Sequence, residues 1–278
     1  MTNLISCRPE SYGRYADRAF EALQQLGVRW VEIPAPAPDK IDEAREKMHR
    51  FGLDAASVTL GAKGQQPDFL DRVRDAVNAA AALGAKVIFT SQHTDESGKQ
   101  PLFARLKQAG EIAAGKDIVI ALETHPDLCN NATVALETMN GIDHPNVRIN
   151  FDPANIHYYN QDVDAVNELR QIAPYVRAVH LKDTNGGFHA HHFPAIGDGV
   201  VDWKGIFSIV NARGMTGPFT LEMEGIAGED LSFEQTQARI QRSLDFLRSL
   251  GVMERGGGRV CVWVCGCVGV WVGECVGV

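Results

Sequence analysis

The segment VRAVHLKD (176–183) is a short apolar run, rich in β-branched residues, that ends in polar residues and carries His180 near its carboxyl end. Three other runs have the same form: IVIALE ends at Glu123, VRINFD ends at Asp152, and PFTLEME contains Glu222. Glu123, Asp152 and His180 follow one another at intervals of 29 and 28 residues (152 − 123 and 180 − 152). Because a helical pattern follows each run, this interval is that of one strand–helix unit. The four polar ends converge only if the strands are parallel and close into a barrel.

The same alternation of strand and helix patterns extends over most of the chain. We expect strands at 3–7, 28–34, 55–60, 86–93, 118–123, 147–152, 176–183 and 218–224. We expect helices at about 12–26, 41–51, 68–83, 101–114, 132–139, 163–172, 202–212 and 233–250. This order predicts a single-domain (β/α)8 TIM barrel over residues 1–252. An open doubly wound sheet would need a glycine-rich phosphate turn after the first strand, and SCRPES is not one.

Length and composition are typical of one large soluble domain. The chain has 278 residues, of which 45% are hydrophobic and 22% charged, with a formal net charge of −8. This acidic balance, without a basic run, argues against a nucleic-acid-binding surface. The first twenty residues lack the apolar stretch of a secretory signal. Since only Cys7 and Cys129 lie in the body of the chain, too few for a disulfide framework, we expect a cytoplasmic protein with no membrane association.

The tail, residues 253–278, differs from the rest of the chain in composition. After Arg255 it uses almost only Val, Gly, Cys and Trp, its apolar stretch before Glu274 is too short to predict a membrane span, and its composition disfavours a helix. All these residue types except Glu274 and Arg259 can be encoded by triplets of G and T alone. We therefore interpret the tail as a translated GT-rich repeat, from a frameshift or a wrongly assigned gene end. The alternative is a functional tail, in which the cysteines suggest metal binding.

The four polar strand ends form a candidate metal site. In a (β/α)8 barrel the active site lies at the carboxyl ends of the strands, so Glu123, Asp152, His180 and Glu222 are expected to face one mouth. Any one acidic residue at a strand end is more often a helix cap or a solvated loop residue. Three carboxylates in one place, however, repel one another unless a positive charge lies between them. Three oxygen ligands and one imidazole suit a divalent cation, Mn²⁺ first, with Mg²⁺, Co²⁺ or Zn²⁺ as alternatives.

The motifs LETH, NFDPAN, VHLKD, PAIGDGVVDW and TLEMEG resemble those of the xylose isomerase-like family of sugar phosphate isomerases and epimerases. The resemblance covers about residues 3–251 and implies that Glu123, Asp152, His180 and Glu222 bind one divalent metal ion. It also implies that Glu123 and Glu222 are the catalytic acid/base pair. The implied reaction is isomerisation or epimerisation of a sugar by proton abstraction next to a carbonyl. The metal would hold the carbonyl and a neighbouring hydroxyl and stabilise a cis-enediolate.

Other polar residues near the strand ends are candidates for substrate binding. Ketose 3-epimerases of this family have a histidine three residues after the metal-binding aspartate, where this chain has Asn155. They also have an arginine after the seventh strand, where this chain has a lysine and several histidines. The substrate contacts are therefore expected to differ. The predicted substrate-binding residues are Asn155, His157, Lys182, His192, His93 and Glu32.

Several alternatives stay open from the sequence. A dehydratase acting on a keto-polyol such as an inosose shares the proton abstraction and differs in the fate of the β-hydroxyl. A catalytically silent sugar-binding barrel would not need both Glu123 and Glu222. The family's apurinic-site endonucleases need more histidines and a basic groove, which this chain lacks. The glycine-flanked Lys63 is a weak candidate for an anion site, so we favour an unphosphorylated sugar or polyol as substrate. The sequence leaves a homo-oligomer open.

Overall fold

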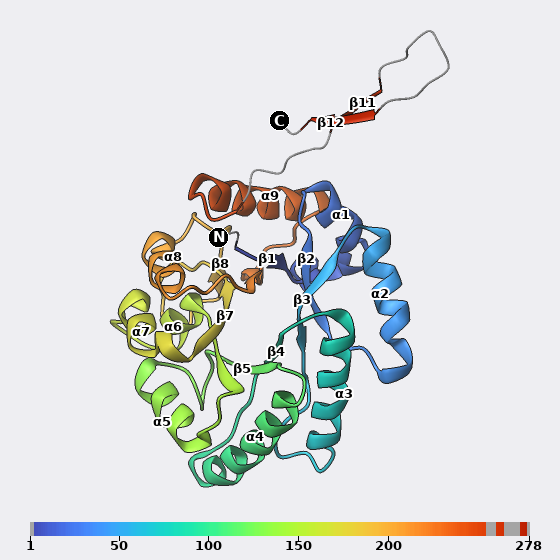
Figure 1. Ribbon diagram of the computed structural model, residues 1–278. Helices are drawn as coiled ribbons and strands as arrows, with labels where there is room; N and C mark the ends of the chain where they lie inside the picture. The colour runs from blue at the N-terminus through green and yellow to red at the C-terminus, as the bar shows by residue number, and fades with distance from the viewer. Residues whose placement is uncertain (1–2, 254–259, 264–272, 277–278) are drawn as a thin grey trace.

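The computed structural model, which describes residues 3–253, 260–263 and 273–276, contains a closed barrel of eight parallel strands surrounded by helices (Figure 1). The strands follow one another around the barrel in chain order, and the last of them pairs with the first. The barrel strands are β1 (Ile5–Cys7), β2 (Trp30–Pro34), β3 (Asp54–Thr59), β4 (Val87–Thr90), β5 (Val119–Glu123), β6 (Val147–Phe151), β7 (Val176–Leu181) and β9 (Phe219–Leu221). The prediction of a (β/α)8 barrel is confirmed.

The helices largely match the expected positions, with one addition. The α-helices are α1 (Ala19–Gln25), α2 (Ile41–Arg50), α3 (Phe69–Leu83), α4 (Lys99–Ala114), α5 (Ala132–Ile142), α6 (Pro153–Tyr159), α7 (Ala165–Ile172), α8 (Trp203–Ala212) and α9 (Phe233–Ser249). The 3₁₀ helices are η1 (Pro9–Arg18), η2 (Pro38–Lys40), η3 (Glu96–Gly98) and η4 (Ala173–Tyr175). Helix α6, which is short and begins directly after β6, was not among the helices expected from the sequence. Its start has a local cause, since Asp152 is the N-cap and Pro153 occupies the first helical position.

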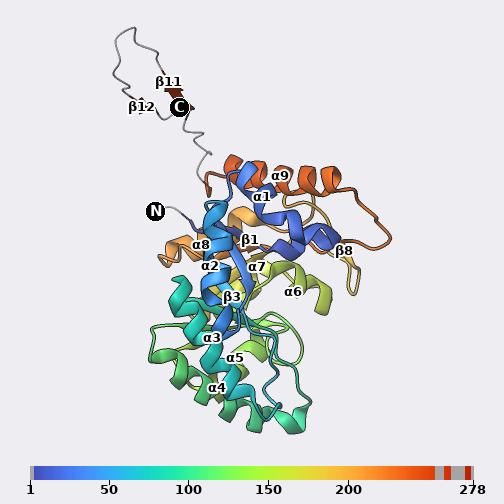
Figure 2. The same cartoon turned by 90° about the vertical axis from the view of Figure 1, so that its right-hand side faces the viewer.

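The last helix of the barrel packs against the segment that follows its first strand. The last helix, α9, contacts η1 and lies beside α1 in both views (Figures 1 and 2). The Phe233 ring at the start of α9 stacks on Tyr12 of η1 at a centroid distance of 6.0 Å. The segment between β9 and α9 therefore runs next to η1, close to the carboxyl ends of β1 and β9.

A second small sheet lies at the carboxyl end of the barrel. Strands β8 (His192–Phe193) and β10 (Gly225–Ile226) pair antiparallel. They join the long loop after β7 to the segment after β9. Strands of two residues are too short to show a pattern in a sequence, and the sequence analysis did not predict them.

Successive side chains of a strand point to opposite sides, and this alternation divides the core in two. In β7, Val179 and Leu181 belong to the large apolar core between strands and helices. Ala178 instead packs inside the barrel in a small cluster with Val87 and Ala121. The interior thus has few apolar side chains and leaves room for polar side chains from the same strand faces.

The carboxylate of Asp183 fixes the long loop after β7. It accepts hydrogen bonds from Gly197 N (2.8 Å), Val201 N (3.2 Å) and Trp203 Nε1 (3.0 Å). A Cβ on Gly199 would lie 2.1 Å from Asp183 Oδ1, so the loop passes close to the carboxylate. This contact explains the glycine at that position of the GDG motif.

Replacing Asp183 by alanine is therefore expected to lower the free energy of unfolding by about 3 kcal/mol, because several buried donors lose a charged acceptor at once. Urea denaturation followed by circular dichroism measures this change. Asp198→Ala is the control, because Asp198 pairs with Arg242 at the surface (2.9 Å) and should cost less than about 1 kcal/mol. Equal losses in the two variants would contradict this role of Asp183.

The structure describes two segments of the tail, β11 (Val260–Trp263) and β12 (Gly273–Val276), which pair antiparallel. The rest of the tail lies outside the described residues, so its interpretation as a translated repeat stays a prediction. Within the described part of the chain, no helix is both long enough and apolar enough to cross a membrane.

Candidate active site

A cavity of about 410 Å³ opens at the carboxyl ends of the barrel strands. Its volume is in the range of small-molecule sites. It is lined by Arg8, Phe89, Ser91, Glu123, His125, Asn155, Tyr158, Tyr159, Lys182, His191, Phe193, Glu222 and Glu224. We call it the active-site cavity below. It lies where the fold was expected to place the site.

The structure brings the four predicted metal ligands together. Glu123, Asp152, His180 and Glu222 each offer one ligand atom, and these atoms all lie within 4.8 Å of one another. They come from four successive barrel strands or from the residue directly after them. The convergence expected from the strand interval is therefore present, and the donor set could hold a divalent cation.

Asp152 is both a helix cap and a member of this cluster. Its Oδ1 accepts hydrogen bonds from Ala154 N (2.9 Å) and Asn155 N (3.0 Å) at the start of α6. Its Oδ2 is buried and accepts no hydrogen bond. Lys182 Nζ is 2.9 Å from Oδ2, which makes an ion pair but not one with hydrogen-bond geometry. Oδ2 therefore already has an ammonium partner, and the fit to a divalent cation rests on the three carboxylates and one imidazole that meet here.

Glu222 and His180 are the two members of the cluster that contact each other directly, and both are buried. His180 Nδ1 lies 3.2 Å from Glu222 Oε2, and its Nε2 lies 3.2 Å from Glu32 Oε1. Burial disfavours the imidazolium, but these two carboxylates outweigh burial and raise the pKa of His180 to about 10. Burial alone would raise the pKa of Glu222, but Lys182 and His180 hold it well below its usual range. Glu222 is therefore ionised.

The pKa of Glu123 is shifted in the opposite direction to that of Glu222. Burial and the nearby charge of Glu222 raise its pKa to about 7, although His180 and Lys182 act in the other direction. The pKa values of the two carboxyl groups in this cavity are thus shifted in opposite directions in the metal-free protein. Such a difference is what separates an acid from a base in a catalytic pair.

Two cations, one from each of the strands that flank β9, stabilise the carboxylates. Lys182 is 2% exposed and its Nζ lies 3.0 Å from Glu222 Oε2 and 3.2 Å from Glu224 Oε2. Arg8, directly after β1, donates a hydrogen bond from a terminal nitrogen to Glu222 Oε1. These contacts provide the positive charge that the crowded carboxylates need in the protein itself.

Lys182 was predicted as a substrate-binding residue, and it lines the active-site cavity. Asn155 also lines the cavity, with its amide donating to Thr124 O at 3.0 Å. Glu32 is buried behind His180, where its Oε2 accepts from Ser57 Oγ at 2.6 Å. Glu32 is thus placed to orient His180 rather than to face the cavity.

The structure does not place the other three predicted residues in the cavity wall. His93 does not line the cavity, but its ring contacts that of His125, which does, at a centroid distance of 4.4 Å. His157 lies on α6 outside the lining. His192 belongs to β8, where its neighbour His191 lines the cavity instead. Substrate contacts by these three histidines stay predictions, and the geometry favours His125 and His191.

Sequence reasoning missed several lining residues, of which Arg8, His125 and Tyr159 are examples. The Tyr159 hydroxyl and His125 Nε2 are 2.6 Å apart and form one wall of the cavity. The sequence did contain a signal for two of them. His125 follows Glu123 by two residues, and Arg8 directly follows β1 as Asp152 directly follows β6.

Comparison with known proteins gives the same fold. The family model for xylose isomerase-like TIM barrels matches residues 20–250. The chain belongs to this family. The resemblance read from the sequence motifs is thereby confirmed.

Curated relatives of the chain include L-ribulose-5-phosphate 3-epimerases. The chain is 27% identical over 251 residues to L-ribulose-5-phosphate 3-epimerase UlaE of Escherichia coli (strain SMS-3-5 / SECEC), covering 79% of this chain and 86% of the relative. In other relatives of the same name, such as that of E. coli strain Crooks, the match spans 66% of the relative's length.

Solved structures of the xylose isomerase-like fold superpose over most of the chain. D-psicose 3-epimerase from Clostridium cellulolyticum H10, solved with D-tagatose, is 16% identical with a TM-score of 0.71, covering 90% of this chain and 99% of that chain. The 3-keto-D-glucoside 4-epimerase YcjR from E. coli is 19% identical with a TM-score of 0.70, covering 89% and 100%. At these identities the likeness establishes the fold.

Proposed function

We propose that this protein is a divalent-metal-dependent sugar epimerase or isomerase that moves a proton at a carbon next to a carbonyl. One observation carries the proposal: Glu123 and Glu222 face one cavity and, with Asp152 and His180, place their ligand atoms within 4.8 Å of one another. The epimerase relatives support the same class of reaction.

Glu123, Asp152, His180 and Glu222 would hold the cation. When bound, it would polarise the substrate carbonyl and so acidify the neighbouring C–H bond. Glu222 would take the proton, and Glu123 would return one from the other side of the substrate. Arg8 and Lys182 would keep Glu222 ionised and in place through their contacts with its two oxygens.

The substrate we propose is an unphosphorylated sugar or polyol. The loop after β3 was the one candidate anion cradle in the sequence, and its donors are occupied. Gly64 N donates to Gln92 Oε1 and Lys63 N to Gln66 Oε1, both at 2.8 Å. Lys63 Nζ donates to Ser91 O at 2.7 Å. A phosphate at this loop would have to displace these internal hydrogen bonds.

Deuterium incorporation tests the reaction class. The full chain with Mn²⁺ would be incubated in D2O with L-ribulose, D-psicose, 3-keto-glucose and an inosose, and the products followed by NMR. We expect deuterium next to the carbonyl and formation of an epimer or isomer. Loss of water from the inosose would instead identify a dehydratase. Absence of exchange with every compound would favour a sugar-binding protein and contradict the proposal.

The metal site is tested separately by Asp152→Asn. Asparagine caps a helix about as well as aspartate, so the fold should be retained while a charged ligand is lost. After chelator treatment, we expect calorimetry to show Mn²⁺ affinity lowered by at least about tenfold, because a charged oxygen ligand is removed from a site that selects hard cations. Asp164→Asn is a matched control, since Asp164 caps α7 through the same two bonds at the surface. Equal Mn²⁺ affinity in both variants would contradict the assignment.

A further inference from the structure

A cavity of about 330 Å³ lies at the amino ends of the barrel strands, on the face opposite the active-site cavity. It lies between the start of β7, where Arg177 is the second residue, and the loop 213–217 that leads from α8 towards β9. Because a strand rises about 3.3 Å per residue, Arg177 and Lys182 are about 16 Å apart along the chain. A small molecule bound in this cavity, which we call the amino-end cavity, therefore does not reach the active-site carboxylates.

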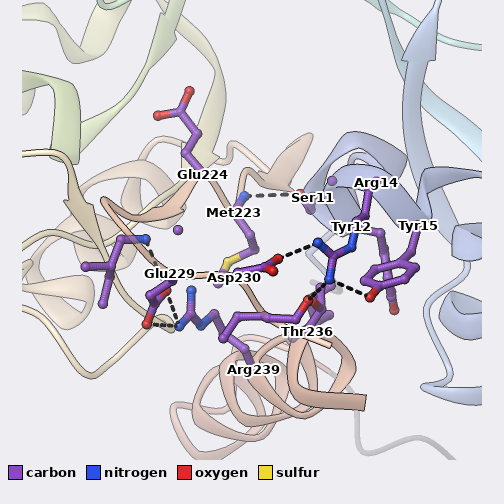
Figure 3. A pocket seen from close by; sticks show the side chains of 15 residues that line it. Ser11, Tyr12, Arg14, Tyr15, Met223, Glu224, Glu229, Asp230, Thr236 and Arg239 are labelled. Carbon is purple, nitrogen blue, oxygen red and sulfur yellow. Dashed lines mark hydrogen bonds and ion pairs between the residues drawn. The ribbon is translucent and has the colours of Figure 1, made fainter. Parts of the chain in front are cut away.

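The charged residues that line the amino-end cavity are all cationic. Its wall contains the guanidinium groups of Arg177 and Arg213 and no carboxylate. The cavity between η1 and α9 has the opposite character, because its arginines are paired there with carboxylates. Arg239, for example, contacts both oxygens of Glu229 at 2.7 Å (Figure 3). An anion would be repelled in the cavity of Figure 3 and attracted in the amino-end cavity.

Other cations at the amino ends of the strands have carboxylate partners. Arg29, just before β2, pairs with Asp54 at the start of β3 (3.0 Å). Lys86, just before β4, pairs with Asp117 before β5 (3.1 Å). Within the described part of the chain, the two arginines of the amino-end cavity have no carboxylate within 4.0 Å. Positive charge is thus left uncompensated in one sector of this face, although the whole chain has a net charge of −8.

The arginines of this sector also repel one another. Arg148 is the second residue of β6, which pairs with β7. Burial lowers the pKa of Arg177, and the charge of Arg213 lowers it further. Burial likewise lowers the pKa of Arg148, and the charge of Arg177 lowers it further. Because these like charges raise the free energy of the folded state, an anion bound between them would stabilise the protein.

The guanidinium of Arg177 is held in a position that suits an oxyanion. Its Nη1 donates hydrogen bonds to Pro174 O (3.0 Å) and Val176 O (2.7 Å), which fix the group at the turn before β7. Its Nε and Nη2 donate to no residue that the structure describes. This pair of nitrogens is one of the edges through which a guanidinium binds two oxygens of a phosphate or carboxylate. Thr216 adds a hydroxyl group to the lining of the same cavity.

We propose that the amino-end cavity binds the phosphate group of a small molecule, held between the guanidinium groups of Arg177 and Arg213. A phosphate ester carries a charge of about −1.5 to −2 at pH 7 and three acceptor oxygens, which match two guanidinium groups. A single carboxylate would leave one positive charge uncompensated. The rest of the ligand would contact Val210 and Met215, which give the cavity apolar surface. Since the active-site cavity lies at the other face, this ligand is distinct from the substrate of the proposed reaction.

Calorimetry of inorganic phosphate binding tests the inference. The full chain is treated with a chelator, so that phosphate cannot bind through a metal ion, and is titrated at low ionic strength, where charges are least screened. We expect one saturable site in the wild type. Its affinity should fall at least about tenfold in Arg177→Gln and in Arg213→Gln, because each variant loses a charge-assisted contact. Arg50→Gln is the matched control, since Arg50 is an exposed arginine of α2 outside the cavity and its loss removes the same charge.

Circular dichroism verifies that the variants fold, and phosphate should raise the Tm of the wild type more than that of either cavity variant. Four results would overturn the inference: no saturable binding to the wild type, wild-type affinity in both cavity variants, an equal loss of affinity in Arg50→Gln, or tighter binding of succinate than of phosphate. The last result would identify a carboxylate site. None of these measurements requires turnover, so their outcome is independent of the proposed function.

Discussion

Glu222→Gln is expected to lower kcat for deuterium incorporation by about 10²- to 10⁴-fold, the range of a lost general base. The neutral amide cannot take a proton from carbon. It does retain one oxygen acceptor for Arg8 or Lys182, so the fold should persist. Glu222 is 6% exposed and contacts Arg8, His180 and Lys182, which hold its carboxylate in one position. The loss should appear in kcat more than in KM, because the interaction that is removed acts in the transition state.

The control for this experiment is Glu137→Gln. Glu137 is a half-exposed partner of Lys99 on α5, with 3.4 Å between the charged atoms. The same chemical change there should leave kcat unaltered. If Glu222→Gln turned over at the wild-type rate while binding Mn²⁺ and sugar, the assignment of Glu222 as the base would be wrong.

Lys182→Met is expected to lower the free energy of unfolding of the metal-free protein by about 3–5 kcal/mol, the cost of removing one partner from a buried ion pair. Lys182 lies within 3.2 Å of oxygens of Asp152, Glu222 and Glu224. Without the ammonium group of Lys182, less positive charge would offset the repulsion among these carboxylates. Urea denaturation in the presence of a chelator measures the change. Lys86→Met is the control, because Lys86 pairs with Asp117 at the surface (3.1 Å) and should cost less than about 1 kcal/mol.

Metal addition provides an independent check on Lys182. If a divalent cation binds among the same carboxylates, saturating Mn²⁺ should stabilise Lys182→Met, because a ligand that binds only the folded state shifts the unfolding equilibrium. The gain should exceed that of the wild type, in which Lys182 already supplies a positive charge. A variant as stable as the wild type without metal would show that Lys182 does not offset the carboxylates.

Much of the fold could be predicted because its signals are local. A β-rich run of about six residues followed by an amphipathic helix recurs along the chain, and parallel strands joined by helices have few ways to close. The elements that escaped prediction lack such signals. Helix α6 has seven residues, and β8 and β10 have two residues each, so their existence depends on caps and on partners elsewhere in the chain.

The candidate site divides in the same way. Glu123, Asp152, His180 and Glu222 could be found because each ends a strand, and strand ends of a parallel barrel meet at one mouth. Glu224 follows Glu222 by two residues and Lys182 follows His180 by two, so alternation in an extended segment places each pair on one side. Lys182 and Glu224 lie just beyond the ends of β7 and β9. The sequence does not distinguish His191 from His192, because which of the two faces the cavity depends on the pairing of β8 with β10. In the structure His192 pairs with Ile226 and His191 lines the cavity.

The sequence by itself determined the barrel, the mouth at which the site lies and the four residues that meet there, because strand period and strand–helix interval are properties of neighbouring residues. Only the tertiary structure decided how these residues are charged and what adjoins them. The contact of His180 with Glu32 joins residues 148 positions apart, and that of Arg8 with Glu222 joins residues 214 apart. A cavity of about 300 Å³ between η1, the segment after β9 and α9 depends on how these three segments pack (Figure 3). Distances of this kind depend on closure of the barrel, which brings the first and last strands side by side.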